Sequence, residues 1–153
     1  MWIISSVSAA ASLSGLALTA FLAATLLPLS SEAVFGALAL AGSASGYVLV
    51  LVAGTANTAG SCVNYWLGRF LEHYRERRWF PVSTVQLSRA QDFYKRWGWP
   101  SLLLSWAPLI GDPLTIAAGF LRLPFGWFLP LVALAKFGRY ALLLWLIRSA
   151  VQG

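Results

Sequence analysis

The chain has 153 residues, of which 59% are hydrophobic and 10% are charged, with a formal net charge of +6. Because a soluble domain carries about 25% charged residues, this composition excludes a soluble globule and predicts an integral membrane protein. One cysteine and one histidine exclude an intramolecular disulfide and offer no basis for a metal site, and we expect no cofactor.

The first predicted element is an apolar hairpin over residues 2–41. Residues 2–27 carry no charge and are long enough to span a membrane, which takes about 20 residues. They lack the basic start and the cleavage site of a signal peptide. Pro28 interrupts the segment, and the returning arm at residues 33–41 is too short to cross. We therefore expect a re-entrant hairpin that turns at Pro28.

A turn at residues 42–46 leads into the first predicted span, residues 47–67. Three polar residues of this span, Asn57, Ser61 and Asn64, stand at spacing i, i+4 and i+7, which places them on one helix face. Such residues serve either as contacts between helices or as the lining of a polar cavity, and both alternatives stay open. The candidate cavity-lining residues are Ser30, Ser31, Asn57, Ser61 and Asn64.

A basic linker follows at residues 69–99. Residues 69–96 hold seven of the eleven Lys and Arg, so the positive-inside rule predicts that this loop is cytoplasmic. A basic patch can also bind nucleic acid, but a short basic loop between spans is explained by topology and by anionic lipid head groups, so we expect no nucleic-acid partner. Within the linker, residues 83–97 predict an interfacial amphipathic helix.

The second half of the chain repeats the order of the first. Residues 101–121 are apolar but are interrupted by Pro108, Gly111 and Pro113. Each arm is too short to span, which predicts a second re-entrant hairpin with these residues at its turns. Residues 125–147 form the last predicted span.

The two hairpins share a pentapeptide that ends in an acid, PLSSE at residues 28–32 and PLIGD at residues 108–112, 80 residues apart. A carboxylate at membrane depth costs roughly 2.5 kcal/mol or more and predicts a functional site. Two acids in matching contexts predict a duplicated, inverted protein. We expect one membrane domain over residues 1–153, with half-repeats near 9–67 and 100–148.

Four membrane-embedded charges are the main site candidates: Glu32, Asp112, Lys136 and Arg139. Burial raises the pKa of a carboxyl and a nearby cation lowers it, so either acid beside a cation is suited to proton coupling. Lys136 and Arg139 share a helix face and match a phosphate. Two alternatives stay open: the acids cap helices, with Asp112 at an N-cap and Pro113 at N1, or all four charges form structural ion pairs.

Five strings carry a family resemblance: LLPLSSE at 26–32, NTAG at 57–60, NYWLGRF at 64–70, LLLSWAPLIGD at 102–112 and KFGRY at 136–140. They resemble the small YqaA-type branch of the DedA (VTT-domain) membrane proteins, over about Phe21 to Arg139. The resemblance implies opposed re-entrant hairpins, a bacterial inner-membrane location and transport or scrambling of lipids. Bacterial members are associated with recycling of undecaprenyl phosphate and with the proton-motive force. Larger members often carry arginines where this chain has Ser105 and Gly111.

The sequence leaves three classes of function to consider. A flippase or scramblase of anionic lipid, either phospholipid or polyprenyl phosphate, fits the repeat and the central charges. Paired acids also occur in intramembrane aspartic proteases, but the Gly-x-Gly-Asp context is absent at residues 109–112, so we expect no enzyme. The third class is a non-catalytic membrane organiser, and a small-solute transporter is a further alternative. Expected partners are membrane lipids, with protons as the candidate coupling ion and a homo-oligomer left open.

Overall fold

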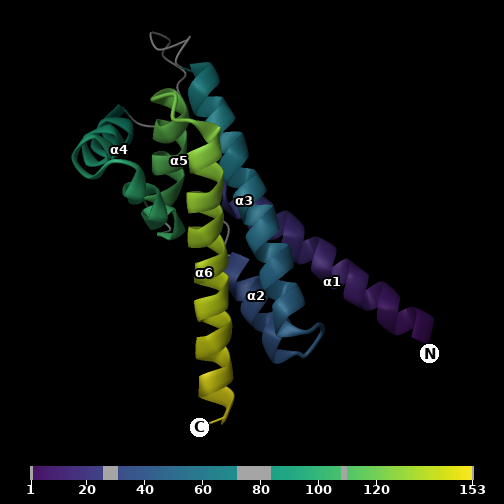
Figure 1. Ribbon diagram of the computed structural model, residues 1–153. Coiled ribbons are helices and arrows are strands. Elements are labelled where there is room, and N and C mark those ends of the chain that lie inside the picture. Colours follow the sequence, from purple (N-terminus) through teal and green to yellow (C-terminus); the bar gives the residue numbers. More distant parts are fainter. Residues whose placement is uncertain (1, 26–30, 72–83, 108–109, 153) are drawn as a thin grey trace. The chain divides into compact units, whose positions relative to one another are not determined.

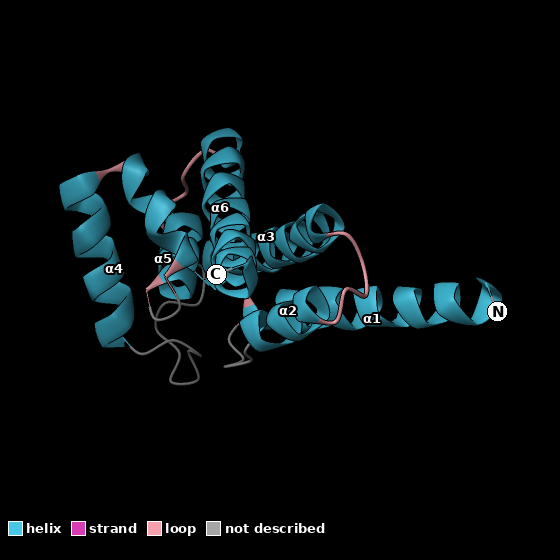
Figure 2. Cartoon of the chain, turned by 90° about the horizontal axis from the view of Figure 1, so that it is seen from below, coloured by secondary structure: helices cyan, strands magenta, loops and turns pink. Residues whose placement is uncertain are grey.

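The protein is described here by a computed structural model that covers residues 2–25, 31–71, 84–107 and 110–152. These residues are helical, with connecting turns and with no strand among them, which confirms the all-helical class (Figure 2). The elements along the chain (Figure 1) are α1 (Trp2–Ala23), α2 (Ser31–Leu40), α3 (Gly46–Leu71), α4 (Thr84–Trp97), the 3₁₀ helix η2 (Trp99–Trp106), α5 (Gly111–Phe120) and α6 (Phe125–Gln152).

The helices form two compact units. The terminal unit comprises Met1–Gly60 and Phe137–Gly153, and the middle unit comprises Ser61–Lys136. The long helices α3 and α6 each contribute residues to both units. This division reflects which residues pack together. The half-repeats near 9–67 and 100–148 concern internal symmetry, which is a different property, and they stay a prediction.

The terminal unit is built from α1, α2 and the adjoining parts of α3 and α6. Its buried core consists of Leu16, Ala20, Phe35, Leu49, Ala53, Tyr140 and Leu144. Two glycines of α3 allow close approach: a Cβ on Gly54 would lie 2.7 Å from the Phe137 ring, and one on Gly60 would lie 2.5 Å from the Phe21 carbonyl oxygen. Small residues at helix contacts are typical of membrane proteins, because apolar lipid supplies little hydrophobic drive between helices.

The middle unit packs α4, η2 and α5 with the adjoining parts of α3 and α6. Its buried core consists of Tyr65, Leu102, Leu114, Ile116, Ala117, Ala118, Leu123, Phe128 and Val132. A Cβ on Gly119 would collide with the backbone of Tyr65, and one on Gly68 would collide with the backbone of Ile116. The helices α3 and α5 therefore touch backbone to backbone, which only glycine permits at these positions.

Within the described residues, two helices are long and apolar enough to cross a membrane, Gly46–Phe70 and Phe125–Gln152, with mean hydropathies of 1.3 and 1.5. The first helix contains the span expected at residues 47–67, and the second contains the span expected at residues 125–147. Each helix extends beyond its expected span. The short helices α2 and α5 have ten residues each, about 15 Å of helix, which is too short to cross. The re-entrant course of the hairpins and the interfacial position of α4 stay predictions.

The second hairpin differs in detail from the expectation. Gly111 and Pro113 lie in the first turn of α5 and do not interrupt a helix. Proline is tolerated there because the first N–H groups of a helix have no intrahelical partner. The approach to this turn is the 3₁₀ helix η2, which follows Gly98 at φ 65°. The expected turn residues Pro28 and Pro108 lie outside the described residues.

Candidate functional site

In the terminal unit, the first turn of α2 is joined to α6 by an ion pair. Arg139 Nη2 contacts Glu32 Oε1, and both side chains are partly buried. The preceding residue of α2 adds a second bond, since Ser31 Oγ and Tyr140 Oη share a hydrogen bond of 2.8 Å. A carboxylate in the first turn of a helix is also favoured by the helix dipole. Two consecutive residues of α2 thus contact two consecutive residues of α6.

In the middle unit, the first turn of α5 is joined to α6 by a second ion pair. Lys136 Nζ lies 3.7 Å from Asp112 Oδ1, and the Lys136 side chain is only 2% exposed. The alternative in which Asp112 is the N-cap does not hold, because Ile110 occupies the N-cap in a helical conformation, with no side-chain capping bond. Asp112 lies inside the first turn, where its carboxylate faces a buried cation.

Further polar side chains gather at the start of α5. Thr115 Oγ1 donates to the Asp112 carbonyl oxygen at 2.8 Å, and Asn64 Nδ2 donates to Thr115 Oγ1 at 3.4 Å. Ser105 is fully buried, and its hydroxyl has no partner among the described residues. Gly111 lies so close to the Ser105 backbone that a Cβ at position 111 would not fit. The ion pair of the middle unit therefore sits beside a small buried polar cluster.

Asn57, Ser61 and Asn64 of α3 are all buried, as their common helix face predicts. Asn57 Nδ2 donates to the Ala20 carbonyl oxygen at 2.7 Å within the terminal unit. This bond supports the role of a helix contact for Asn57, as the bond to Thr115 does for Asn64. The Asn57 side-chain oxygen and the Ser61 hydroxyl are buried without a partner in the described part of the chain. The role of cavity lining stays a prediction, and Ser30 lies outside the described residues.

Two residues that form hydrogen bonds beside the ion pairs, Tyr140 and Thr115, were not among the residues predicted from the sequence. Each carried a local signal: Tyr140 directly follows Arg139, and Thr115 stands three residues after Asp112, one helical turn on. Neither position in the sequence indicates which residue of another helix lies beside it. Among the residues whose positions are described, no three His, Cys, Asp or Glu side chains gather as a metal site would require.

Known proteins are similar in sequence to this chain over most of its length. Residues 28–149 match the family described as the VTT domain. The chain is 41% identical over 133 residues to "Inner membrane protein YqaA" of Escherichia coli (strain K12), covering 87% of this chain and 89% of the relative, and equally to the protein of that name from Shigella flexneri. It is 35% identical over 136 residues to an uncharacterized protein of Haemophilus influenzae, covering 84% and 83%. No solved structure matches.

Proposed function

Because this chain belongs to the VTT-domain family of membrane proteins, in the YqaA-type branch of the DedA proteins, we propose that it moves anionic lipid across a membrane, as a flippase or scramblase. The observation that carries the proposal is that each unit pairs an acid in the first turn of a ten-residue helix with a cation of α6. Charges at membrane depth are costly, so two such pairs support a role in handling charged cargo.

The pairs support a simple exchange between protons and lipid phosphate. While Glu32 or Asp112 is ionised, it occupies its cation. Protonation neutralises the carboxylate and releases Arg139 or Lys136, and the freed cation binds a phosphate. Deprotonation reverses the exchange and expels the phosphate. Proton binding and lipid binding are thereby linked through the same cation.

The proposed location and topology follow from the relatives and from charge. The two YqaA relatives are named inner membrane proteins, and we place this chain in the bacterial inner membrane as a multi-pass protein. The basic loop at residues 69–96 faces the cytoplasm by the positive-inside rule. Membrane lipids are then its partners.

One observation favours a second candidate, a non-catalytic membrane organiser. Lys136 is almost fully buried against Asp112, and a permanently closed ion pair of this kind serves packing specificity and not transport. The two candidates differ in what happens when the acids are made neutral. A transporter loses its coupling, whereas an organiser keeps its function as long as it folds.

The test is lipid movement in proteoliposomes, with fluorescent phospholipid and with fluorescent polyprenyl phosphate, each with and without a pH gradient. The variants are Glu32→Gln and Asp112→Asn, and the matched control is Asp92→Asn, an exposed acid on α4. We expect both site variants to lose movement and its response to the gradient, and the control to keep both.

Full activity and unchanged pH dependence in both site variants would refute the proposal. If the folded wild-type protein moves neither lipid, the organiser or a small-solute transporter replaces it.

A further inference from the structure

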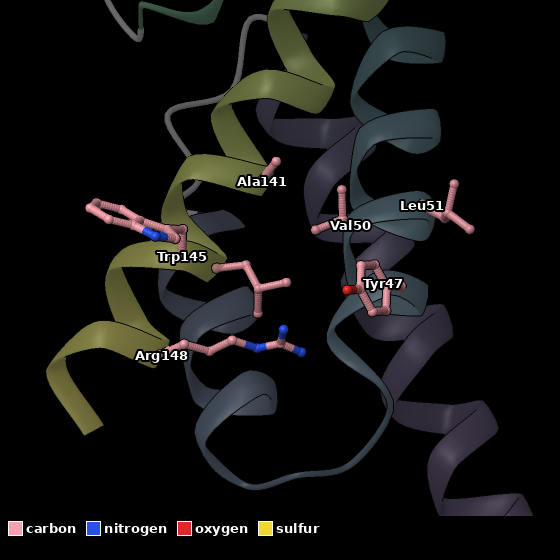
Figure 3. A pocket seen from close by; sticks show the side chains of 7 residues that line it. Tyr47, Val50, Leu51, Ala141, Trp145 and Arg148 are labelled. Carbon is pink, nitrogen blue, oxygen red and sulfur yellow. The ribbon is translucent and has the colours of Figure 1, made fainter. Parts of the chain in front are cut away.

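A groove between α3 and α6 lies within the terminal unit, and neither residue of that unit's ion pair lines it (Figure 3). Its volume is about 380 Å³, within the range of about 300–1,000 Å³ found for ligand sites. The lining residues are Tyr47, Val50, Leu51, Ala141, Leu144, Trp145 and Arg148. Six of these seven side chains are aliphatic or aromatic.

One end of the groove carries a cation and two aromatic rings. Figure 3 shows the Arg148 guanidinium reaching from α6 toward α3, and its central carbon lies 5.6 Å from the centroid of the Tyr47 ring. Trp145 stands one helical turn before Arg148 on α6. Tyr, Trp and Arg at the end of a span are typical of the membrane–water interface. The groove is therefore apolar along its length and cationic at its interfacial end.

Among the described residues of the terminal unit, no Asp or Glu side chain pairs with Arg148. Glu32 is the one acid in the sequence of this unit, and its carboxylate contacts Arg139. Arg148 itself is exposed, and its guanidinium faces the Tyr47 ring. Its charge is thus directed at the mouth of the groove, and none of the ion pairs in the described part of the chain involves it.

The first residue of α3 allows Arg148 to lie across the groove. A Cβ on Gly46 would lie 2.7 Å from Arg148 Nη2 and 2.7 Å from Leu144 Cδ2. Any side chain at position 46 would push both groups aside. Glycine therefore permits the cation and the apolar wall to meet at the start of α3.

We propose that this groove is a resident site for an anionic phospholipid of the phosphatidylglycerol type. The phosphate binds the Arg148 guanidinium, which suits phosphate oxygens in a forked geometry. One acyl chain lies along Val50, Ala141 and Leu144. From Arg148 back to Ala141 the groove follows seven residues of α6, about 10 Å toward the middle of the membrane. This site holds a lipid and is separate from the ion pairs, so it goes beyond the proposed transport.

The first test is lipid retention by the full chain. The protein is reconstituted into nanodiscs of phosphatidylglycerol and phosphatidylcholine in equal amounts, re-extracted into mild detergent, and its bound lipid is measured by native mass spectrometry. We expect the wild type to retain phosphatidylglycerol and Arg148→Gln to retain about tenfold less, as for loss of a hydrogen bond to a charged group. Arg148→Lys keeps the positive charge and should retain most of the lipid.

A second pair of variants tests the acyl-chain wall. Ala141→Phe fills the groove, whereas Leu142→Phe adds a similar ring on an exposed neighbour that does not line it. We expect lipid loss only in Ala141→Phe. Glu32→Gln and Asp112→Asn should retain the lipid even where they abolish transport, so failure of this site and failure of the transport proposal are told apart.

Three results would overturn the site. These are equal phosphatidylglycerol retention in Arg148→Gln and wild type, equal retention of phosphatidylcholine by the wild type, and a disulfide cross-link between copies through Leu51→Cys showing that a second chain covers the groove.

Discussion

Each of the two compact units pairs an acid with a cation of α6, but the two pairs are buried to different degrees. In the terminal unit the pair of Glu32 and Arg139 is partly exposed and is reinforced by the bond between Ser31 and Tyr140. In the middle unit Lys136 is 2% exposed and lies 3.7 Å from Asp112. Similar pentapeptides thus lead to a reinforced, partly exposed pair in one unit and, in the other, to a pair whose cation is buried and whose acid is 21% exposed. The cost of breaking a pair depends on the charge that is left behind, so the units should respond differently to the same substitution.

The largest effect is expected for Asp112→Ala in the middle unit. It leaves the buried Lys136 ammonium without its carboxylate, at a cost of about 3–5 kcal/mol in the free energy of unfolding. An SDS-titrated unfolding curve in mixed micelles measures this free energy. The double variant Asp112→Ala with Lys136→Met removes both charges and should recover most of the loss. If the double variant is as unstable as the single one, the buried charge is not the cause.

A smaller but clear effect is expected for Gly119→Ala, also in the middle unit. The new Cβ meets the Tyr65 backbone, which cannot move away without separating α3 from α5. Overpacking of this kind costs about 1–3 kcal/mol. In the terminal unit, the three atoms nearest to a Cβ on Gly54 all belong to the Phe137 ring, which can rotate, so the cost of Gly54→Ala should be lower.

Gly138→Ala is the matched control for both glycine variants, because a Cβ there has no atom within 4 Å beyond its own helix. It should leave the unfolding curve unchanged or shift it slightly upward, since alanine favours helix. Equal losses in all three variants would contradict the difference in packing.

The bond that reinforces the terminal pair can be removed alone. Tyr140→Phe deletes the hydroxyl and leaves Ser31 Oγ buried without this partner, which should cost about 1 kcal/mol. Unfolding in the same micelles measures it, and Ser31→Ala with Tyr140→Phe should be no worse than Tyr140→Phe. A larger additional loss in the double variant would show that Ser31 has another structural role.

The smallest effect on stability is expected for Glu32→Ala. Because Arg139 and Glu32 are 18% and 33% exposed, water compensates for much of the lost contact, and the free energy of unfolding should fall by about 1 kcal/mol or less. Asp92→Ala on the exposed face of α4 provides the baseline. A loss as large as that of Asp112→Ala would remove the distinction between the two units.

Sequence alone anticipated most of the helices. The predicted span at residues 125–147 lies inside α6, and the predicted helix at 83–97 matches α4 within one residue, because apolar length and helical periodicity are local properties of a chain. The start of α5 was less predictable. Asp before Pro is a good N-cap signal that predicts a helix from Pro113, yet the helix begins two residues earlier, at Gly111, whose lack of a side chain lets it contact the Ser105 backbone.

Composition and motif strings are read without knowing any contact, so they were enough to indicate the membrane class, the family and the four charges that stand within apolar segments. The pairing of Glu32 with Arg139 and of Asp112 with Lys136 follows from how the helices pack, because these partners come from different helices and no local period relates them. The same holds for the groove at Arg148, whose wall on α3 lies about 100 residues earlier in the chain and is brought beside α6 by packing at small residues.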